Sequence, residues 1–347
     1  MMKVIIGKKV LEKLNYHLRE MAYSKPYIIT DHNVKGLYGQ YLSDILKDYD
    51  HAFYSIPPGE KSKSVDMVLA IYDDLIDKKI DRGSLIIAFG GGVVGDLAGF
   101  IASTFKRGIA YIQIPTSLLA QVDSSIGGKV GIDYGGLKNI IGSFYFPQLV
   151  FIDVSLLKTL SHRDVICGLA EILKYGLIAD YHLFKYACSN FDKVFNKNED
   201  LLLELVNSSV CIKQEIVKRD KLDKGERRIL NFGHTIGHGI ESLYDFNKYN
   251  HGEAVILGMI YESYIGMEMG LIDSSYFIEI YNSLIELIKP IRFKEDEIKS
   301  LLDLMRNDKK NLDNKFIFIL PTGKGQVGVF DNIDTDLIIK SLKGEWF

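Results

Sequence analysis

The sequence predicts an α/β N-terminal domain with a Rossmann-like parallel sheet, followed by a mostly α-helical C-terminal domain. In the first half of the chain, short runs rich in β-branched residues alternate with helical patterns, which is typical of a parallel sheet covered by helices. From Val165 to about Leu304 the apolar residues recur at helical spacing instead. A chain of 347 residues is longer than one compact domain usually requires. We therefore expect an α/β domain over 1–155 and a helical domain over 156–347.

The expected elements of the first half follow one another in a regular order. Strands are expected at 3–7, 27–31, 51–56, 84–92 and 110–117. Helices are expected at 37–48, 65–80 and 93–105. The run SLIIAFGGG at 84–92 is almost wholly apolar and ends in glycines, as a strand buried inside a parallel sheet does. Ligands bind at the carboxyl ends of such strands, so the residues that follow each strand are candidates for a site.

The second half begins with a change of character near 151–164. This segment, FIDVSLLKTLSHRD, is expected to form a last strand and a hinge. Helical patterns then continue, and short strands return only at 316–323 and 326–330. Two domains of different character predict a cleft between them, which is the usual place for a ligand site.

Composition argues against several classes of protein. A hydrophobic share of 47% and a charged share of 25% indicate a globular protein with sizeable cores. A net charge of −3 provides no basic field for nucleic acid or an anionic membrane. The longest apolar runs, at 85–89 and 254–260, are far shorter than the roughly 20 residues of a membrane span. The N-terminus lacks a signal-peptide pattern and the three cysteines form no CxxC motif, so we expect free thiols in the cytoplasm.

The stretch from Arg227 to Val255 contains three of the eight histidines. His234 and His238 are four residues apart in a run with helical periodicity, so their imidazoles share one helix face. His251 opens a second apolar run after a polar break. Histidines on two helices that can converge predict a metal site, although each histidine taken singly fits an ordinary cap or helix-face position.

The helical half of the chain also contains a carboxylate and several cations that are candidates for a site. Glu171 is in the middle of an apolar helical run, where a carboxylate either faces solvent or is paired with a cation. One glutamate and two histidines with open coordination positions form a catalytic zinc pattern. Lys174 shares the helix face of Glu171, and Lys213 and Arg227 add positive charge from the next two segments.

Other groups in the first half predict recognition of phosphate or carboxylate. The motif GGGVVGD at 90–96 follows the buried strand and opens a helix, where free N–H groups can approach a pyrophosphate. Asp31 ends the second strand, and Glu60 and Lys63 follow the third; each is a candidate contact to a nucleotide, or part of an exposed charged turn. Four cationic or amide donors lie among glycines, as anion recognition requires, or in a solvated loop: Arg107, Lys129, Lys138 and Asn139.

These motifs, taken in order, resemble the 3-dehydroquinate synthase family of sugar-phosphate cyclases. The resemblance runs from about Asp31 to Lys310 and rests on GGGVVGD, PTSLLAQVDSSIGGKVGID, LKN, AEILKYG, LNFGHTIGH, HGEAV and MRNDKK. It implies an α/β NAD-binding domain over 1–155 and a helical metal- and substrate-binding domain over 156–347, usually in a homodimer. Where the family often has Glu before Gly-x-Arg, this chain has Asp223, whose shorter side chain alters the reach of the carboxylate.

The resemblance assigns roles to residues at the matching positions. It implies a Zn²⁺ or Co²⁺ ion bound by Glu171, His234 and His251, and it moves His238 from the metal to the phosphate of the substrate. The residues implied for NAD are Asp31, Asn33, Glu60, Lys63, Gly91, Gly92, Asp96, Thr116, Ser117, Lys129, Lys138 and Thr159. Those implied for the substrate or for catalysis are Asp123, Lys129, Asn139, Lys174, Lys213, Asp223, Arg227, Asn231, His238, Lys309 and Lys310, with Arg107 reaching the site of the partner subunit.

The reaction that the resemblance implies converts 3-deoxy-D-arabino-heptulosonate 7-phosphate, a phosphorylated sugar acid of the shikimate pathway, into 3-dehydroquinate. It combines transient oxidation by NAD, phosphate elimination, re-reduction and an intramolecular aldol closure. Two alternatives have a similar architecture: a cyclase of the 2-deoxy-scyllo-inosose synthase type, and a metal-dependent polyol dehydrogenase. A non-catalytic NAD-binding protein is a third, but the full set of candidate metal and phosphate residues argues against it.

Overall fold

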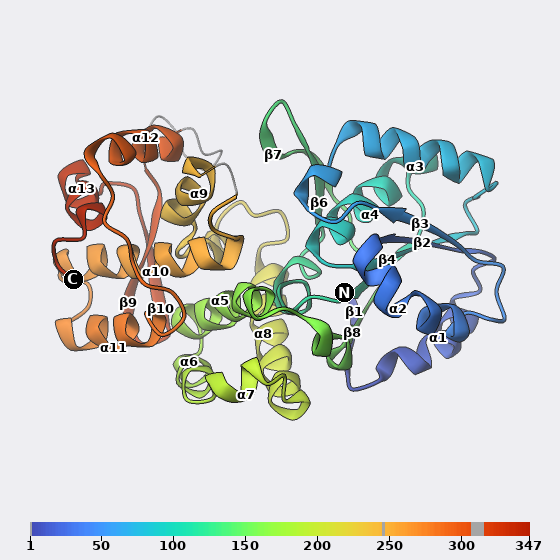
Figure 1. The fold of residues 1–347 in the computed structure, drawn as a ribbon, viewed down its shortest axis with the longest axis horizontal. Helices are drawn as coiled ribbons and strands as arrows, with labels where there is room; N and C mark the ends of the chain where they lie inside the picture. Colours follow the sequence, from blue (N-terminus) through green and yellow to red (C-terminus); the bar gives the residue numbers. More distant parts are fainter. Residues whose placement is uncertain (1, 245–246, 307–315) are drawn as a thin grey trace. The chain divides into compact units, whose positions relative to one another are not determined.

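The computed structural model describes residues 2–244, 247–306 and 316–347 (Figure 1). The chain forms two compact units. The first unit comprises Met1–Ser161 and Lys197–Val210, and the second comprises His162–Asn196 and Cys211–Phe347. Helix α8 (Glu199–Arg219) therefore contributes residues to both units.

A six-stranded sheet in the order β1-β8-β5-β4-β2-β3 forms the centre of the first unit, and its neighbouring strands pair in parallel. Its strands are β1 (Lys3–Gly7), β2 (Pro26–Asp31), β3 (Ala52–Ile56), β4 (Leu85–Gly90), β5 (Tyr111–Pro115) and β8 (Leu149–Asp153). Its helices include α1 (Leu14–Met21), α2 (His32–Ile45), α3 (Val65–Asp77) and α4 (Gly92–Thr104). The predicted fold class is confirmed for this part of the chain.

Helices cover both faces of this sheet because successive strand residues point in opposite directions. On β2, Tyr27 and Ile29 pack in one core together with apolar residues of α3 and α4. Ile28, between them, packs in the other core with residues of α1 and α2. Each face therefore buries its own hydrophobic layer, which explains why the strands read as continuous apolar runs.

Two local features differ from the sequence prediction. Helix α2 begins at residue 32 instead of 37, because the Asp31 carboxylate accepts hydrogen bonds from the backbone N–H groups of Asn33 and Val34 at 2.9 and 3.0 Å. The segment after β5 contains a single π-helical turn (Ala120–Ser124) and an antiparallel hairpin, β6 (Lys129–Tyr134) with β7 (Leu137–Phe144), which the pattern did not predict.

Helices dominate the second unit. They are α5 (His162–Ile178), α6 (Tyr181–Cys188), α7 (Phe191–Phe195), α9 (His234–Leu243), α10 (His251–Glu268), α11 (Ser274–Leu284), α12 (Glu295–Arg306) and α13 (Thr335–Lys343). The expected late strands are confirmed as an antiparallel pair, β9 (Phe318–Gly323) and β10 (Gln326–Phe330). None of the helices in the described part of the chain combines the length and apolarity of a membrane span.

Helix α10 is the central element of the second unit. Its residues from Gly252 to Gly266 are almost all buried, and a helix that is apolar on every side belongs in a core. Its neighbour α9 approaches it closely at Gly258: a Cβ atom there would lie 1.9 Å from the carbonyl oxygen of Gly233. Only a residue without a side chain permits this approach.

We expect Gly258→Ala to lower the free energy of unfolding by about 2 kcal/mol or more, because the added methyl group would force α9 and α10 apart. Gly36→Ala is the matched control, since Gly36 lies in α2 and a methyl group added there would have no heavy atom within 4 Å. That change should stabilise the protein by about 0.5–1 kcal/mol, because alanine favours helix. Chemical denaturation of both variants measures the two values, and an unchanged Gly258→Ala protein would contradict this packing.

Candidate functional site

Three helices of the second unit bring Glu171, His234 and His251 together. The Nε2 atoms of His234 and His251 each lie 3.6 Å from Oε1 of Glu171. The two imidazole centroids are 5.3 Å apart. These distances are too long for hydrogen bonds and close to the ~3.4 Å that separates ligand atoms around a tetrahedral ion at ~2.1 Å.

The carboxylate of Glu171 has an environment that suits a cation. The residue is 1% exposed, and Oε1 has no hydrogen-bond partner among the described residues. Its other oxygen, Oε2, is paired with the ammonium group of Lys174, which is also buried. A buried carboxylate oxygen without a donor is costly, and a divalent ion between this oxygen and the two imidazoles would remove that cost. The three residues therefore fit a metal ion.

Each candidate histidine ligand is oriented by a contact on its other nitrogen. Nδ1 of His251 lies 3.1 Å from Oε2 of Glu241, and Nδ1 of His234 lies 3.0 Å from the carbonyl oxygen of Phe232. Such contacts leave Nε2 available to a metal. Burial lowers the pKa of His251, but the neighbouring carboxylates of Glu171 and Glu241 raise it to about 10. The two carboxylates thus favour positive charge at this point of the structure.

A second group of candidate ligands, His238, Glu241 and His251, shares one histidine with the first. In it, the Glu241 carboxylate is at hydrogen-bond distance from the ring of His251, so this contact orients the imidazole instead of leaving room for an ion. The ring of His238 lies 5.3 Å from that of His234 and 6.1 Å from that of His251. The expectation that His234 and His238 lie on one helix face agrees with this geometry.

Local sequence determines how His251 meets Glu171. The side chain of Asn250 accepts a hydrogen bond from the N–H of Glu253, and the Glu253 carboxylate accepts one from the N–H of Asn250, so a capping box starts α10 at His251. At Gly252, a Cβ atom would lie 2.4 Å from Cα of Cys167 on α5. The first turn of α10 therefore lies directly against α5, one turn before Glu171.

Among its described residues, the second unit contains three buried lysine and arginine side chains, one of which is Lys174 beside Glu171. Lys174, Lys213 and Arg227 are 2%, 5% and 3% exposed, and buried cations require nearby anions. Arg227 follows a turn that the Asp220 carboxylate organises by accepting from three backbone N–H groups. Asp223 lies in that turn with a left-handed φ of 57°. Asn231 ends the short 3₁₀ helix of Glu226–Asn231, while Lys309 and Lys310 lie outside the described residues.

Lys63 is the centre of a polar cluster in the first unit. Its ammonium group is 2.9 Å from Asp96 and 3.2 Å from Glu60, and it donates to the side-chain oxygen of Asn139. Burial lowers the pKa of Lys63, but the charges of Asp96 and Glu60 outweigh that effect and raise it. Residues from three separate segments that the sequence singled out are therefore brought together, with Glu60, Asp96 and Asn139 around the ammonium group of Lys63.

The glycine motif lies at the carboxyl ends of two neighbouring strands. Gly90 of β4 pairs with Pro115 of β5, and the N–H of Thr116 donates to the carbonyl of Gly90. Gly91 is the N-cap of α4, and a Cβ atom there would lie 3.4 Å from Oγ of Ser117. The N-terminal N–H groups of α4 thus lie at the sheet edge where α/β proteins bind phosphates.

The other residues predicted for the first unit are placed as follows. Asp31 caps α2, which is a structural function that the sequence pattern did not assign. The hydroxyl of Thr159 lies 2.9 Å from that of Tyr38. Asp123 belongs to the π-helical turn, Lys129 begins β6 and Lys138 lies in β7.

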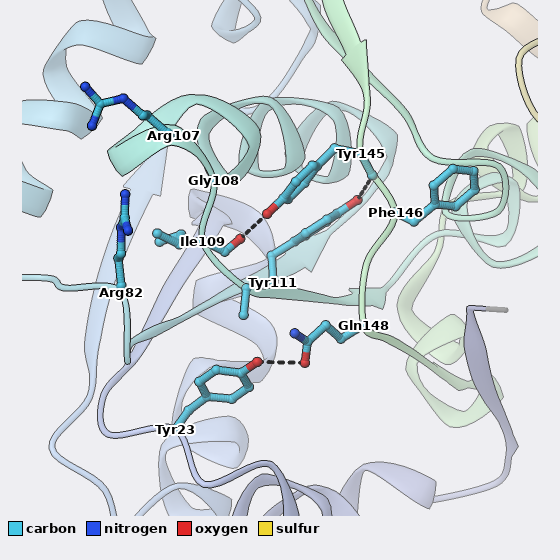
Figure 2. A pocket seen from close by; sticks show the side chains of 10 residues that line it. Tyr23, Arg82, Arg107, Gly108, Ile109, Tyr111, Tyr145, Phe146 and Gln148 are labelled. Atoms are coloured by element: carbon cyan, nitrogen blue, oxygen red, sulfur yellow. Dashed lines mark hydrogen bonds between the residues drawn. The ribbon is translucent and has the colours of Figure 1, made fainter.

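Arg107 lines a surface pocket of about 510 Å³ together with Arg82. Figure 2 shows both arginine side chains on one side of the pocket, with Tyr111 and Tyr145 stacked on the other. The backbone at Lys106, Arg107 and Gly108 has positive φ angles of 50°, 66° and 110°, and Arg82 donates a hydrogen bond to the carbonyl of Lys106. Consecutive left-handed residues are uncommon outside glycine and often mark functional segments.

Two buried glutamates near the histidines were missed by sequence reasoning, Glu241 and Glu262. The signal that could have found them is the one that identified Glu171: a single acidic residue inside an apolar helical run. Glu241 orients His251. Glu262 accepts hydrogen bonds from the backbone of α9.

Comparisons with known proteins identify the family of this chain. The family model described as "3-dehydroquinate synthase N-terminal" matches residues 53–167. The model described as "3-dehydroquinate synthase C-terminal" matches residues 168–311. A 3-dehydroquinate synthase from Alkaliphilus metalliredigens (strain QYMF) is 45% identical over 93% of this chain and 90% of the relative.

Two solved structures have similar folds. The 2-epi-5-epi-valiolone synthase ValA of Streptomyces hygroscopicus subsp. jinggangensis 5008, with NAD⁺ and Zn²⁺ bound, has a TM-score of 0.87 at 26% identity, covering 99% of this chain and 96% of ValA. A 2-deoxy-scyllo-inosose synthase complexed with carbaglucose-6-phosphate, NAD⁺ and Co²⁺ has a TM-score of 0.88 at 26% identity, covering 98% and 96%. The two matching family models and the 45% identical relative show that the chain belongs to the 3-dehydroquinate synthase family.

Proposed function

We propose that this protein converts 3-deoxy-D-arabino-heptulosonate 7-phosphate into 3-dehydroquinate and phosphate, with NAD and a divalent metal as cofactors. Family membership supports the reaction. The observation that carries the site assignment is the convergence of two imidazoles on the buried, otherwise unsatisfied Oε1 of Glu171. Zn²⁺ and Co²⁺ are the candidate ions, because two proteins of similar fold contain them.

Glu171, His234 and His251 would bind the metal. When bound, a divalent ion polarises a substrate hydroxyl and lowers its pKa. Lys174 pairs with Oε2 of Glu171, the oxygen that does not face the histidines, and Glu241 orients the imidazole of His251. These contacts hold the three ligand atoms close to their positions before the metal binds, which reduces the cost of binding.

The first unit would bind NAD, and the bound cofactor would supply reversible hydride transfer to and from the substrate. Backbone N–H groups at the start of α4, next to Gly91 and Gly92, suit its pyrophosphate. The cluster around Lys63 lies on the neighbouring elements, with Asp96 in α4. Further proposed contacts come from strand ends, from the helical turns that follow them and from the hairpin: Asp31, Asn33, Glu60, Thr116, Ser117, Lys129, Lys138 and Thr159.

The remaining cations would neutralise the substrate, which carries both a carboxylate and a phosphate. We assign the carboxylate to Lys213, Arg227 and Asn231, and the phosphate to His238 together with Lys309 or Lys310. Asp123, Lys129, Asn139, Lys174 and Asp223 are the further proposed contacts. In this scheme the substrate is oxidised at one carbon, and the new ketone acidifies the neighbouring C–H. Phosphate then leaves, taking up that proton on its own oxygens, before re-reduction and ring closure.

We also propose that the enzyme is a cytoplasmic homodimer in which Arg107 reaches the site of the partner subunit. The left-handed backbone at Lys106 and Arg107 and the supporting bond from Arg82 favour a specific function for this arginine. The three cysteines are free thiols, as a reducing compartment maintains them.

The alternative is a cyclase that acts on a sugar phosphate without a carboxylate. The solved 2-deoxy-scyllo-inosose synthase shares the fold and its complex contains a phosphorylated carbasugar. Its 26% identity is much lower than the 45% of the 3-dehydroquinate synthase relative. The buried guanidinium of Arg227 and ammonium of Lys213 suit an additional anionic group.

Purified enzyme supplied with NAD and Zn²⁺ should release phosphate from 3-deoxy-D-arabino-heptulosonate 7-phosphate without accumulating NADH, because the hydride returns within each turnover. A phosphate assay and absorbance at 340 nm measure the two quantities. Turnover of glucose 6-phosphate instead would favour the alternative cyclase. Stoichiometric NADH production would indicate a dehydrogenase.

Glu171→Ala and His251→Ala should lose bound metal and reduce the rate of phosphate release by about 10³-fold or more, since metal polarisation supplies several kcal/mol. His182→Ala is the control, because His182 lies exposed on α6 of the same unit. Metal content by mass spectrometry and the phosphate assay check both effects. Full metal content in either variant would refute its assignment as a ligand.

Arg107→Ala and His251→Ala should each be nearly inactive when separate but should complement each other when mixed. If Arg107 serves the partner's site, a mixed dimer has one site with an intact His251 and an intact arginine from the other subunit. After denaturation and co-refolding, random pairing predicts about a quarter of wild-type activity. Lack of recovery, with dimers confirmed by gel filtration, would place Arg107 in the site of its own subunit or outside it.

A further inference from the structure

Glu262 is a fully buried carboxylate for which the proposed reaction has no role. It lies in α10 with an exposed fraction of 0%. Its side chain accepts hydrogen bonds from the backbone N–H of Gly233 at 2.6 Å and of Ile236 at 3.2 Å. Burying an ionised carboxylate costs free energy unless the carboxylate is hydrogen-bonded. These two hydrogen bonds offset a substantial part of that cost.

The two N–H groups belong to the first turn of α9, on either side of His234. The first N–H groups of a helix have no partner within the helix and normally bond to the N-cap side chain. Here the N-cap is Gly233, which has no side-chain cap. Glu262 therefore supplies the cap from another helix, at the positive end of the α9 dipole.

A cap supplied from α10 has a geometric consequence that a local cap would not have. Glu262 and His251 belong to the same helix, whereas the N–H groups that Glu262 binds flank His234. The carboxylate therefore links the backbone of one candidate metal ligand to the helix that carries another. Gly258, one turn before Glu262, allows the close approach that this link requires.

We propose that Glu262 is a positioning residue for the metal site. It fixes the first turn of α9 against α10, and thereby places Nε2 of His234 at the distance from His251 and Glu171 that a metal ion requires. This inference depends on the proposed metal site. Glu262 differs from Glu241 in the groups that it binds: Glu262 accepts hydrogen bonds from backbone N–H groups of α9, whereas Glu241 contacts the imidazole of His251.

Glu262→Gln is the variant that tests this role. Glutamine has the same shape, but only one of its two terminal atoms accepts a hydrogen bond, so one of the two N–H groups would face an NH₂ group. Glu268→Gln is the matched control, because Glu268 lies in the same helix and pairs with Lys340 at the surface.

We expect Glu262→Gln to bind Zn²⁺ about tenfold more weakly in competition with a chelator, as the loss of supporting contacts around a metal typically does. The visible absorption spectrum of the Co²⁺-loaded protein should also change, because it reports the geometry of the ligands. Glu268→Gln should match the wild type in both measurements. A Glu262→Gln protein with wild-type affinity and an unchanged Co²⁺ spectrum would overturn the proposal.

The increase in melting temperature on adding Zn²⁺ separates positioning from general stabilisation. If Glu262 only stabilises the fold, the metal-free and metal-loaded variants are destabilised equally, and the increase equals that of the wild type. If it positions the metal site, the increase is smaller, because the stabilisation of the folded state by bound metal grows with the logarithm of the metal affinity. An increase equal to that of the wild type therefore counts against the proposal.

Wild-type protein provides a measurement that does not depend on the folding of any variant. Hydrogen exchange at the amides of Gly233 and Ile236 should slow when Zn²⁺ binds, if the capped turn and the metal site are coupled. Unchanged exchange at both amides would contradict the coupling. If wild-type protein binds neither Zn²⁺ nor Co²⁺, the metal assignment is wrong, and the inference about Glu262 is wrong with it. If wild-type protein binds the metal but Glu262→Gln behaves like the wild type, only the role of Glu262 is wrong.

Discussion

The burial of the Glu171 carboxylate is the constraint on which the second unit depends. Burying an acidic side chain inside an apolar helix costs free energy unless each carboxylate oxygen has a hydrogen-bond donor, a cation or a metal ion beside it. Lys174 matches one oxygen, and the imidazoles of His234 and His251 face the other. This arrangement requires three helices to meet at short distances, which explains the absence of side chains at Gly252 and Gly258. The candidate metal site consequently depends on the packing of α5, α9 and α10, because a change that separates these helices also separates the candidate ligands.

The anion sites proposed for the two units would rely on different physical means. In the first unit, backbone groups at the carboxyl ends of β4 and β5 and at the start of α4 offer N–H donors, and the buried ammonium group of Lys63 lies beside Asp96 and Glu60. In the second unit, long side chains extend from helices into the interior, as the buried Lys213 and Arg227 show. A nucleotide diphosphate suits the first arrangement, because its charge is spread along a backbone-sized group. A compact sugar acid with charges at both ends suits the second.

Much of the fold and part of the site could be predicted from the sequence. The predictions of alternating strands and helices, of a helical second half and of late strands were correct. Each depends on the spacing of apolar residues within one element. The helical spacing also placed His234 and His238 as neighbours. The roles given to individual residues came from the family motifs and stay predictions, including the assignment of NAD and metal to separate domains. The hairpin of β6 and β7 was not predicted, because most of β7 is exposed and lacks the alternating pattern of a half-buried strand.

The sequence by itself determined most of the elements and the motifs they carry, since capping boxes, periodicity and glycine-ended strands act over a few residues. The tertiary structure alone decided which distant side chains meet. Glu241 meets His251 across 10 residues, and Glu262 meets Gly233 across 29, each from a different helix. Such contacts depend on how helices pack, and the pattern within one helix reports only which face is buried, not which group on another helix it will face.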